Sequence, residues 1–353
     1  MTAVPEGLME RLLEPQPAPA GMNSREIVRR AVEFDGPPRI PYSFMVPMKT
    51  DFFETGVLEW LQRGQEEPGS TSQLGDVRTD EWGVGWEVTT RWWDHSFHHP
   101  LRDLGELGGY RFPDVAAPER FAWMAPHLAR AREAGKYVVG HNPIGMYERM
   151  RHLIGFEDLM IAPYTQPDGL EALLDQLTDL TIAIMDRWVE IGPIDAFMSA
   201  EDWGLQTQLQ MKIDTFRQFY KSRYARLVEA AHERGMHYFW HNCGFISDMI
   251  PDMIEIGVDL AQLDQPRLMG HGPLTDAFGG RICFWNTVDI QWSTGPNVTE
   301  EAVRAEVAEM TRAFARFNGG FIARHYPQPW DIGLSNEMQE LIYQTFLENG
   351  CAL

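Results

Sequence analysis

The chain has 353 residues, and its 44% hydrophobic and 23% charged residues are typical of a globular protein with a large core. Its formal net charge of -21 argues against binding to nucleic acid or to an anionic membrane. No apolar run approaches the roughly 20 residues of a membrane span, and the first residues lack the basic start and apolar core of a secretory signal. Three cysteines provide no disulfide framework, which favours a reducing, cytoplasmic location.

The amino-terminal third divides into an arm, the start of a domain and a compositionally unusual segment. Residues 1–24 are rich in Pro and Ala, and we expect a partly ordered arm ahead of a single domain over 25–353. Within that domain a helix is predicted over 25–33 and a first strand over 42–46. Residues 50–120 are rich in Trp, His, Gly and Pro and include Trp92-Trp93, so we expect an elaborated lid there.

Strands and helices alternate regularly beyond this segment. Strands are expected over 137–140, 194–199, 237–240, 258–263, 281–286 and 319–323. Helices are expected over 118–134, 170–191, 214–234, 245–256, from the cap Thr299 onward, and over 336–348. Such alternation implies a parallel sheet, and about eight strands in one domain predict an α/β fold of the distorted (β/α)8 barrel type. No Gly-rich phosphate-binding sequence follows the first strand, which weakens a dinucleotide-binding fold.

Polar residues gather where these strands end, which is where barrel enzymes place their active sites. The residues at or just beyond the strand ends are His141, Glu201, Asp202, Trp203, His241, Cys243, Asp264, Gln265, Asp289, His325 and Tyr326. Their convergence is a stronger signal than any one motif.

His241 and Cys243, two residues apart in a short polar loop, are the candidate zinc ligands. A lone His-x-Cys pair is a weak signal, because cysteine is often a small buried hydrophobic residue. We prefer His325 as the third ligand, and the alternative is a hydrogen-bonded histidine of the substrate pocket. Cys283 is expected in the core, and Cys351, near the carboxyl terminus, is expected to fray.

The remaining residues at the strand ends have two interpretations each. Glu201 and Asp202 are candidates for acid/base catalysis or for orienting a metal ligand, and the alternatives are a helix cap and a loop charge. We expect a substrate pocket lined by His141, Trp203, Asp264, Gln265 and Asp289. The alternative for tryptophans such as Trp203 is a place in the core, where aromatic residues are common. Tyr326 and the Trp-rich lid are expected to enclose the substrate.

Several sequences, in order along the chain, resemble the uroporphyrinogen decarboxylase superfamily and in particular its cobalamin-dependent methyltransferase branch. The most specific is His241-Asn-Cys-Gly244 followed by Ile250-Pro-Asp-Met-Ile-Glu-Ile-Gly-Val-Asp259. The others are Ser24-Arg-Glu, Arg39-Ile-Pro41, Asp80-Glu-Trp-Gly83, His99-Pro-Leu101, Tyr110-Arg-Phe-Pro113, Glu201-Asp-Trp-Gly204, Asn286-Thr-Val-Asp289 and Gly319-Gly-Phe-Ile322.

The resemblance implies zinc held by the His and Cys of the His-x-Cys motif and by a later Cys, with a separate corrinoid protein carrying cobalamin. His241 and Cys243 match, but the later Cys is replaced by the sequence Arg324-His-Tyr-Pro-Gln-Pro329, in which His325 is the chemical substitute. A histidine in place of a thiolate makes zinc a stronger Lewis acid, which suits oxygen activation.

The leading hypothesis is a zinc-dependent methyltransferase that moves a methyl group from a small donor, such as a methyl aryl ether, to the corrinoid of a partner protein. A methylcobalamin:thiol methyltransferase of the coenzyme M type is the close alternative. A metal-free decarboxylase is less favoured, because the region 42–53 contains Lys49 and no Arg with which to bind a polycarboxylate. A non-catalytic binding barrel is the third class, and a homodimer is the default expectation.

Overall fold

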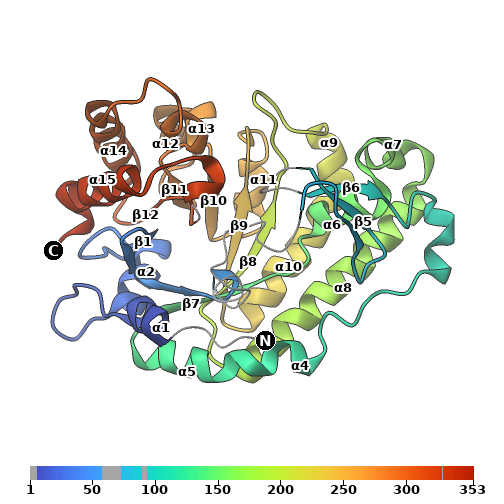
Figure 1. Ribbon diagram of the computed structural model, residues 1–353, viewed down its shortest axis with the longest axis horizontal. Coiled ribbons are helices and arrows are strands. Elements are labelled where there is room, and N and C mark those ends of the chain that lie inside the picture. Colours follow the sequence, from blue (N-terminus) through green and yellow to red (C-terminus); the bar gives the residue numbers. More distant parts are fainter. Residues whose placement is uncertain (1–5, 58–72, 90–93, 328) are drawn as a thin grey trace.

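The computed structural model describes residues 6–57, 73–89, 94–327 and 329–353, which fold around one barrel-shaped sheet (Figure 1). Within these residues the sheet has nine strands, and all but one of them run parallel. The parallel strands follow one another in the order β1 (Tyr42–Met45), β12 (Phe321–Arg324), β11 (Cys283–Thr287), β10 (Leu260–Leu263), β9 (His237–Asn242), β8 (Ala196–Glu201), β7 (Tyr137–His141) and β3 (Phe52–Glu54). The other strand, β2 (Met48–Thr50), is antiparallel to β1. The predicted distorted (β/α)8 barrel is therefore confirmed.

The barrel closes at Asp51, which lies between β2 and β3. The backbone N–H of Asp51 donates to the carbonyl of Tyr42 on β1 (2.9 Å), and its carbonyl accepts from the N–H of Tyr137 on β7 (3.0 Å). These bonds join the two edges of the sheet at the end where the parallel strands begin. Strand β3 lies inside the segment 50–120 that we expected to be a lid, and its three residues are too few to show an alternating pattern.

Helices cover the outside of the barrel, and Figure 1 shows α14 and α15 on one side and α8 and α10 on the other. Those before β9 are α4 (Pro118–Phe121), α5 (Ala125–Glu133), α6 (Met146–Ile154), α7 (Phe156–Thr165), α8 (Pro167–Ile191), α9 (Ile213–Thr215) and α10 (Lys221–Glu233). Those after it are α11 (Ile250–Glu255), α12 (His271–Phe278), α13 (Ile290–Ser293), α14 (Glu300–Phe314) and α15 (Asn336–Phe346). The predicted cap of α14 is confirmed, since the Thr299 hydroxyl accepts the N–H of Ala302.

Two further helices lie near the end of the barrel where the strands begin. In α2 (Ser24–Val32), the carbonyl of Ala31 accepts from the N–H of Gly320, just before β12, and the N–H of Arg25 donates to Gly135, just before β7. The apolar side of α2 thereby closes this end of the barrel. The other helix, α1 (Glu6–Leu13), packs its buried apolar residues into the main core.

The barrel interior is filled by an aromatic and aliphatic cluster distinct from the core between strands and helices. Because alternate residues of a strand point to opposite faces, every second residue of each strand enters this interior. The interior cluster consists of Val28, Ala31, Val32, Phe52, Tyr137, Val139, Ala196, Met198, Phe239, Leu260, Cys283, Trp285 and Ile322. The prediction that Cys283 belongs to the core is confirmed.

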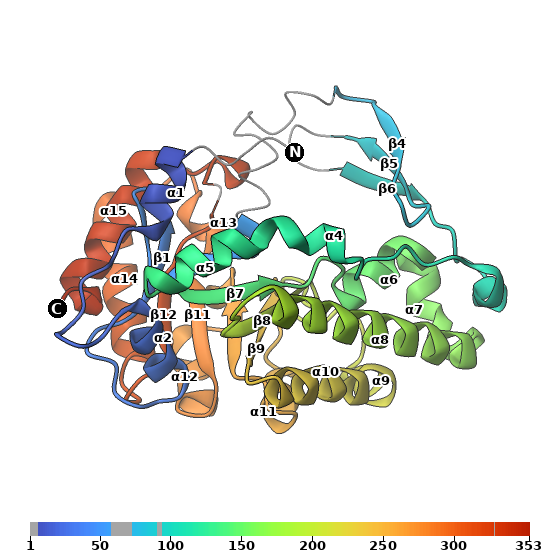
Figure 2. The ribbon, with the colours of Figure 1, turned by 90° about the horizontal axis from the view of Figure 1, so that it is seen from below.

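A small antiparallel sheet stands apart from the barrel on the side of α6 (Figure 2). Its strands are β4 (Val77–Thr79), β5 (Gly85–Val88) and β6 (Asp94–His98). The ring of Trp86 contacts the ring of His152 at 4.6 Å, and the Arg149 guanidinium lies 4.4 Å from the ring of Trp82, so α6 carries this sheet. Trp92 and Trp93, expected in the lid, lie outside the described residues.

Two local predictions are wrong. The helix expected over 245–256 begins only at Ile250, because the N–H of Phe245 donates to the carbonyl of Leu205 (2.7 Å) in the neighbouring loop. Cys351 does not fray: its side chain is buried, and the carbonyl of Gly350 accepts from the N–H of Ile40. In both places a tertiary contact decides a structure that the local sequence left undetermined.

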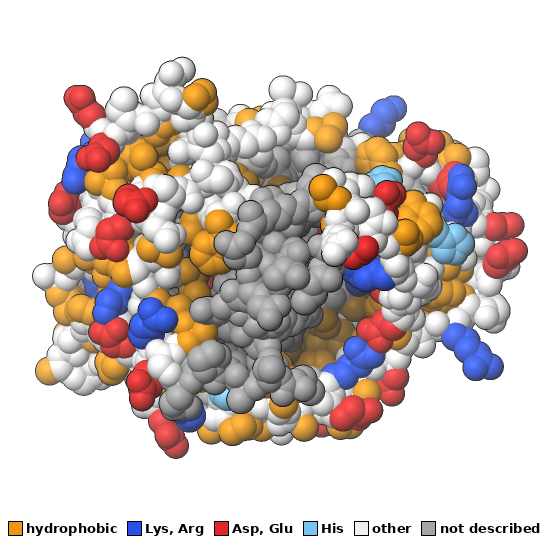
Figure 3. Space-filling model, in the orientation of Figure 1, with side chains coloured by type: hydrophobic (Ala, Val, Ile, Leu, Met, Phe, Trp, Pro, Cys, Tyr) orange, Lys and Arg blue, Asp and Glu red, His pale blue; other side chains and the backbone are white. Residues whose placement is uncertain are grey.

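None of the described helices is both long enough and apolar enough to cross a membrane. Figure 3 shows acidic and basic side chains interspersed over the described part of one face, with no large basic patch there.

Candidate functional site

Two neighbouring loops bring the candidate metal ligands together at the carboxyl end of the strands, which we call the mouth of the barrel. Strands β8 and β9 are parallel neighbours in which Glu201 pairs with Asn242. The residues that follow β8, beginning with Asp202, therefore lie beside those that follow β9. His241 is two residues beyond the interior residue Phe239, so its side chain points into the barrel.

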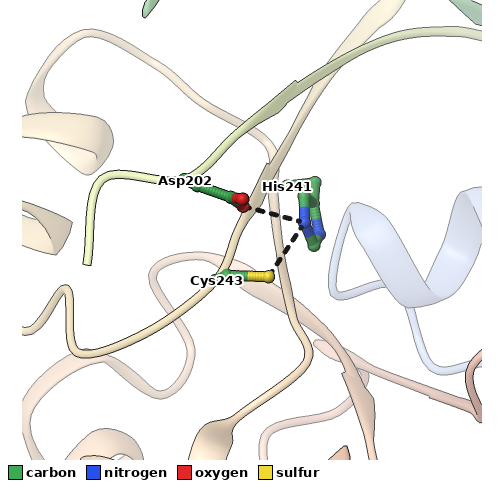
Figure 4. Close-up of side chains that lie close together, drawn as sticks. All are labelled: Asp202, His241 and Cys243. Atoms are coloured by element: carbon green, nitrogen blue, oxygen red, sulfur yellow. Dashed lines mark hydrogen bonds and ion pairs between the residues drawn. The ribbon is translucent and has the colours of Figure 1, made fainter. Parts of the chain in front are cut away.

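The ligand atoms of Asp202, His241 and Cys243 all lie within 4.8 Å of one another (Figure 4). Nε2 of His241 is 3.5 Å from Sγ of Cys243 and 3.7 Å from Oδ1 of Asp202. Tetrahedral zinc, with bonds of about 2.3 Å to sulfur and about 2.0 Å to nitrogen, would hold these two donors about 3.5 Å apart. The donor set therefore fits zinc and leaves a fourth position for a substrate.

Gly204 and Gly244 allow the two loops to approach each other. The N–H of Gly204 donates to the carbonyl of Cys243 (3.2 Å). A Cβ atom on Gly204 would stand 2.5 Å from the backbone of Gly244, and one on Gly244 would stand 2.4 Å from the backbone of Gly204. Gly244 also has a φ of 77°, in the left-handed region that favours glycine. These glycines thus place Asp202 beside Cys243.

Gln262 on β10 orients the imidazole of His241. Its Oε1 is hydrogen-bonded to Nδ1 of His241, and its Nε2 donates to Oδ1 of Asp264 (2.7 Å). Because an amide oxygen can only accept, Nδ1 carries the hydrogen of the neutral ring, and the lone pair of Nε2 faces Asp202 and Cys243. Metal-binding histidines are commonly oriented in this way.

The three candidate ligands influence one another's protonation. Burial alone would lower the pKa of His241, but Cys243 and Asp202 outweigh it and raise that pKa well above its usual value. Burial raises the pKa of Cys243 to about 11, with His241 opposing it. Burial also acts to raise the pKa of Asp202, but His241 and Cys243 hold it below its usual value. Near neutral pH a metal must therefore displace protons from His241 and Cys243.

His325, the predicted third ligand, lies outside this group of atoms. Its Nδ1 accepts the backbone N–H of Tyr326 (2.7 Å), so Nε2 carries the hydrogen of the neutral ring and has no lone pair for a metal. Burial lowers the pKa of His325 to about 3, which keeps the ring neutral. Among the described residues, the group of side chains that could hold a metal joins Asp202, and not His325, to His241 and Cys243.

Glu201, predicted to act in catalysis, is directed toward α6. Its carboxylate accepts the N–H of Met146 (2.7 Å) and that of Glu148 (3.1 Å) in the first turn of that helix, and the hydroxyl of Tyr224 (3.0 Å). Burial raises the pKa of Glu201 to about 8. This is the capping role that we considered as the alternative, and it fixes α6 to the end of β8.

Three of the predicted pocket residues support the mouth without lining it. Trp203 is fully buried, with its ring stacked on that of Tyr147 at 4.0 Å. Asp289 is buried and caps α13 by accepting two backbone N–H groups. Oε1 of Gln265 accepts the N–H of Gly244 (2.6 Å), which holds the loop that carries Cys243.

His141, Asp264 and Tyr326 remain at the mouth. Nε2 of His141 lies 3.6 Å from Oε2 of Glu54 on β3. Asp264 accepts from Gln262, as described above. Burial raises the pKa of Tyr326, and the nearby charges that affect it are those of Asp264, Asp331, Cys243 and Arg324. Tyr326 follows the last residue of β12, Arg324, by two positions.

The sequence interpretation missed three residues at the mouth, namely Glu54, Gln262 and Arg324. Each follows an interior residue by two positions on its strand: Phe52, Leu260 and Ile322 respectively. Counting by twos from the interior positions would have identified them, but short strands with both faces buried do not reveal which residues face inward.

Barrels with polar residues gathered at the strand ends form a large class of enzyme folds. The uroporphyrinogen decarboxylase (URO-D) family profile matches residues 96–324, more than half of the chain. The chain belongs to this family, as the sequence resemblance indicated. A methyltransferase from Methanosarcina mazei has a similar structure, with a TM-score of 0.57, 18% sequence identity, and coverage of 98% of this chain and 91% of that one. At this identity the similarity shows the fold. The search of curated proteins found no match.

Proposed function

We propose that this protein is a zinc-dependent methyltransferase that moves a methyl group from a small donor to the corrinoid of a partner protein. The observation that carries the proposal is the convergence of Asp202, His241 and Cys243 on one point at the barrel mouth. The structural similarity to a protein named as a methyltransferase supports it.

Asp202, His241 and Cys243 would hold the metal, and Gln262 would keep Nε2 of His241 directed toward it. Bound there, zinc would supply a Lewis acid for the heteroatom that loses the methyl group, while cobalamin on the partner would receive that group. Tyr326 would border the donor beside the ligands. Glu201 would act only by fixing α6 against β8.

The donor set favours an oxygen-linked methyl group over a thioether. Only one of the three candidate ligands is a thiolate, whereas Asp202 and His241 supply harder donors. A harder set leaves zinc a stronger Lewis acid, which suits a leaving alkoxide or phenolate. Methyl aryl ethers are therefore the leading donor class, and methyl transfer to a thiol such as coenzyme M remains the alternative.

A metal-free decarboxylase is the second candidate, because the family to which the chain belongs is named for that activity. The arginine and lysine near the first strand do not favour it. Arg39 is buried against Asp51, and Nζ of Lys49 is bonded to both carboxylate oxygens of Glu14 at 2.6 Å. Neither is free to bind a polycarboxylate.

The first test is the metal content of protein purified without chelators and then loaded with zinc. We expect about one zinc per chain in the wild type and in the surface control His232→Ala, and loss of zinc in Asp202→Ala, His241→Ala and Cys243→Ser. Zinc-loaded protein should then form methylcobalamin from reduced cobalamin and a methoxybenzene donor, followed by absorbance. A folded wild type that cannot be loaded with zinc would contradict the proposal and favour decarboxylase chemistry.

A further inference from the structure

The described residues include three basic side chains that are buried, and their surroundings differ. Arg39 has Asp51 as a partner at 2.5 Å. Nζ of Lys136 donates to the carbonyls of Glu14 (2.7 Å) and Thr50 (2.5 Å). Arg324 is only 6% exposed, yet within the described parts of the chain it donates no hydrogen bond and has no carboxylate oxygen within 4.0 Å. Its one close partner is the ring of Trp285.

Arg324 lies on the floor of the barrel mouth. It is the last residue of β12 and follows the interior residue Ile322 by two positions, so its side chain points into the barrel. Its guanidinium carbon is 4.8 Å from the ring centre of Trp285, which in turn is stacked on Phe52 at 4.6 Å. The guanidinium therefore lies over the aromatic interior, and its N–H groups donate to none of the described residues.

The carboxylate of Glu54 interacts electrostatically with Arg324 but already contacts two other side chains. Oε1 of Glu54 accepts the hydroxyl of Ser43 (3.1 Å), and its Oε2 faces Nε2 of His141 at 3.6 Å. Burial would raise the pKa of Glu54, but His141 and Arg324 outweigh it and lower that pKa, so the charges of Arg324 and Glu54 attract each other without a direct ion pair. The N–H groups of Arg324 therefore donate to no described residue, and a ligand carboxylate that enters the mouth would supply the charge-assisted hydrogen bonds that they lack.

We propose that Arg324 binds a carboxylate of the substrate, so that the substrate is a small carboxylic acid held at one end by Arg324 and at the other by the Asp202–His241–Cys243 cluster. The guanidinium fork matches a carboxylate with two parallel hydrogen bonds. A single negative charge is favoured over a dianion such as phosphate, because Glu54 and Asp264 lie in the same mouth. Arg324 and His241 follow the interior residues Ile322 and Phe239 by two positions at the carboxyl ends of their strands, so the two ends face one space.

The identity of this acid as a methyl donor rests on the proposed function, but the carboxylate site itself can be tested without methyl transfer. The test is calorimetric titration at pH 7 of metal-free and zinc-loaded protein with 4-methoxybenzoate and methoxyacetate, each compared with its neutral amide. We expect at least one acid to bind about tenfold or more tightly than its amide, the size of effect typical of a hydrogen bond to a charged group.

Variants assign the preference to one side chain. In Arg324→Gln the preference for acid over amide should disappear, and in Arg324→Lys it should be reduced, because lysine retains the charge but not the fork. Arg267→Gln is the matched control: Arg267 also lies over a tryptophan, Trp292 at 4.7 Å, but it is paired with Glu306. This variant should retain the full preference. Folding of each variant is checked by thermal unfolding.

The outcomes separate this proposal from the proposed function. If neither acid binds more tightly than its amide, or if folded Arg324→Gln retains the preference, the carboxylate site is overturned even where zinc binds and methyl transfer occurs. If the protein binds no zinc but prefers the acids through Arg324, the carboxylate site stands and the zinc-dependent function fails.

Discussion

Where the barrel strands begin, Arg39 and Asp51 form a fully buried ion pair at 2.5 Å, whereas at the mouth Arg324, only 6% exposed, forms no ion pair with any described residue. The Asp51 carboxylate also accepts the Ser24 hydroxyl (2.6 Å) and the N–H of Tyr42 (3.0 Å). At the mouth, by contrast, Nε2 of both His141 and His325 is buried and has no hydrogen-bond partner in the described parts of the chain. The end where the strands begin thus pairs its buried charged groups within the chain. At the mouth, polar and charged groups lack such partners among the described residues.

This difference separates groups that maintain the fold from groups prepared for a ligand. The cluster around Asp51 ties together β1, β3, β7 and the amino-terminal arm, since Nε of Arg39 also donates to the carbonyl of Pro17 (2.8 Å). Polar groups left unsatisfied at the active end of a barrel are candidates for binding a ligand. The comparison predicts that similar substitutions at the two ends will have opposite consequences.

The largest effect is expected for Arg39→Met, which leaves the Asp51 carboxylate buried without its partner. Breaking such a pair costs about 3–5 kcal/mol, measured as the free energy of unfolding in urea. Arg102→Met is the control, because Arg102 pairs with Asp158 on the surface and should change stability by less than about 1 kcal/mol. Equal effects of the two substitutions would show that the Asp51 cluster does not hold the barrel closed.

A pH series sharpens the comparison at the same end. Burial lowers the pKa of Lys136 from 10.5 to about 8 despite Asp51 and Glu14. Between pH 8 and 10.5 the unfolded chain binds a proton at Lys136 that the folded chain lacks, so stability contributed by this residue rises with pH. Relative to Lys136→Met, the wild type should gain up to about 3 kcal/mol over that range, at about 1.4 kcal/mol per unit of pKa shift. A difference that is constant with pH would refute this.

Gln262→Leu tests whether the mouth is arranged for a metal. Without the amide oxygen, Nδ1 of His241 loses the acceptor that directs Nε2 toward Asp202 and Cys243. We expect zinc affinity to fall about 10- to 100-fold, measured by competition with a chromophoric chelator. Gln344→Leu, on the surface of α15 where Gln344 bonds to Glu340, should leave the affinity unchanged. An unaltered affinity in Gln262→Leu would indicate that Gln262 does not orient the ligand.

The smallest effect is expected for Arg324→Met in metal-free protein. Its effect on the free energy of unfolding should be opposite in sign to that of Arg39→Met. Removing a buried charge that has no direct ion-pair partner should increase the free energy of unfolding by about 1 kcal/mol, after subtracting the lost contact with Trp285 and the lost attraction to Glu54. A decrease comparable to that of Arg39→Met would mean that Arg324 stabilises the fold and would remove the contrast between the two ends.

The barrel could be predicted from the sequence because the patterns that indicate it are local. Apolar runs separated by amphipathic helices appear along the chain from 118 onward, and polar residues follow each run. The same local signal made His241 and Cys243 the candidate metal ligands, and their spacing within one loop brings them close before any tertiary contact forms.

Tertiary structure alone decided the rest of the candidate site. Asp202, and not His325, lies beside His241 and Cys243 because Gly204 packs on Gly244, a contact between loops 40 residues apart in sequence. Whether Glu201 points to α6 and Arg324 into the barrel depends on which face of each strand is inward. A strand buried on both faces does not encode that direction in its own residues, so only the packed barrel determines it.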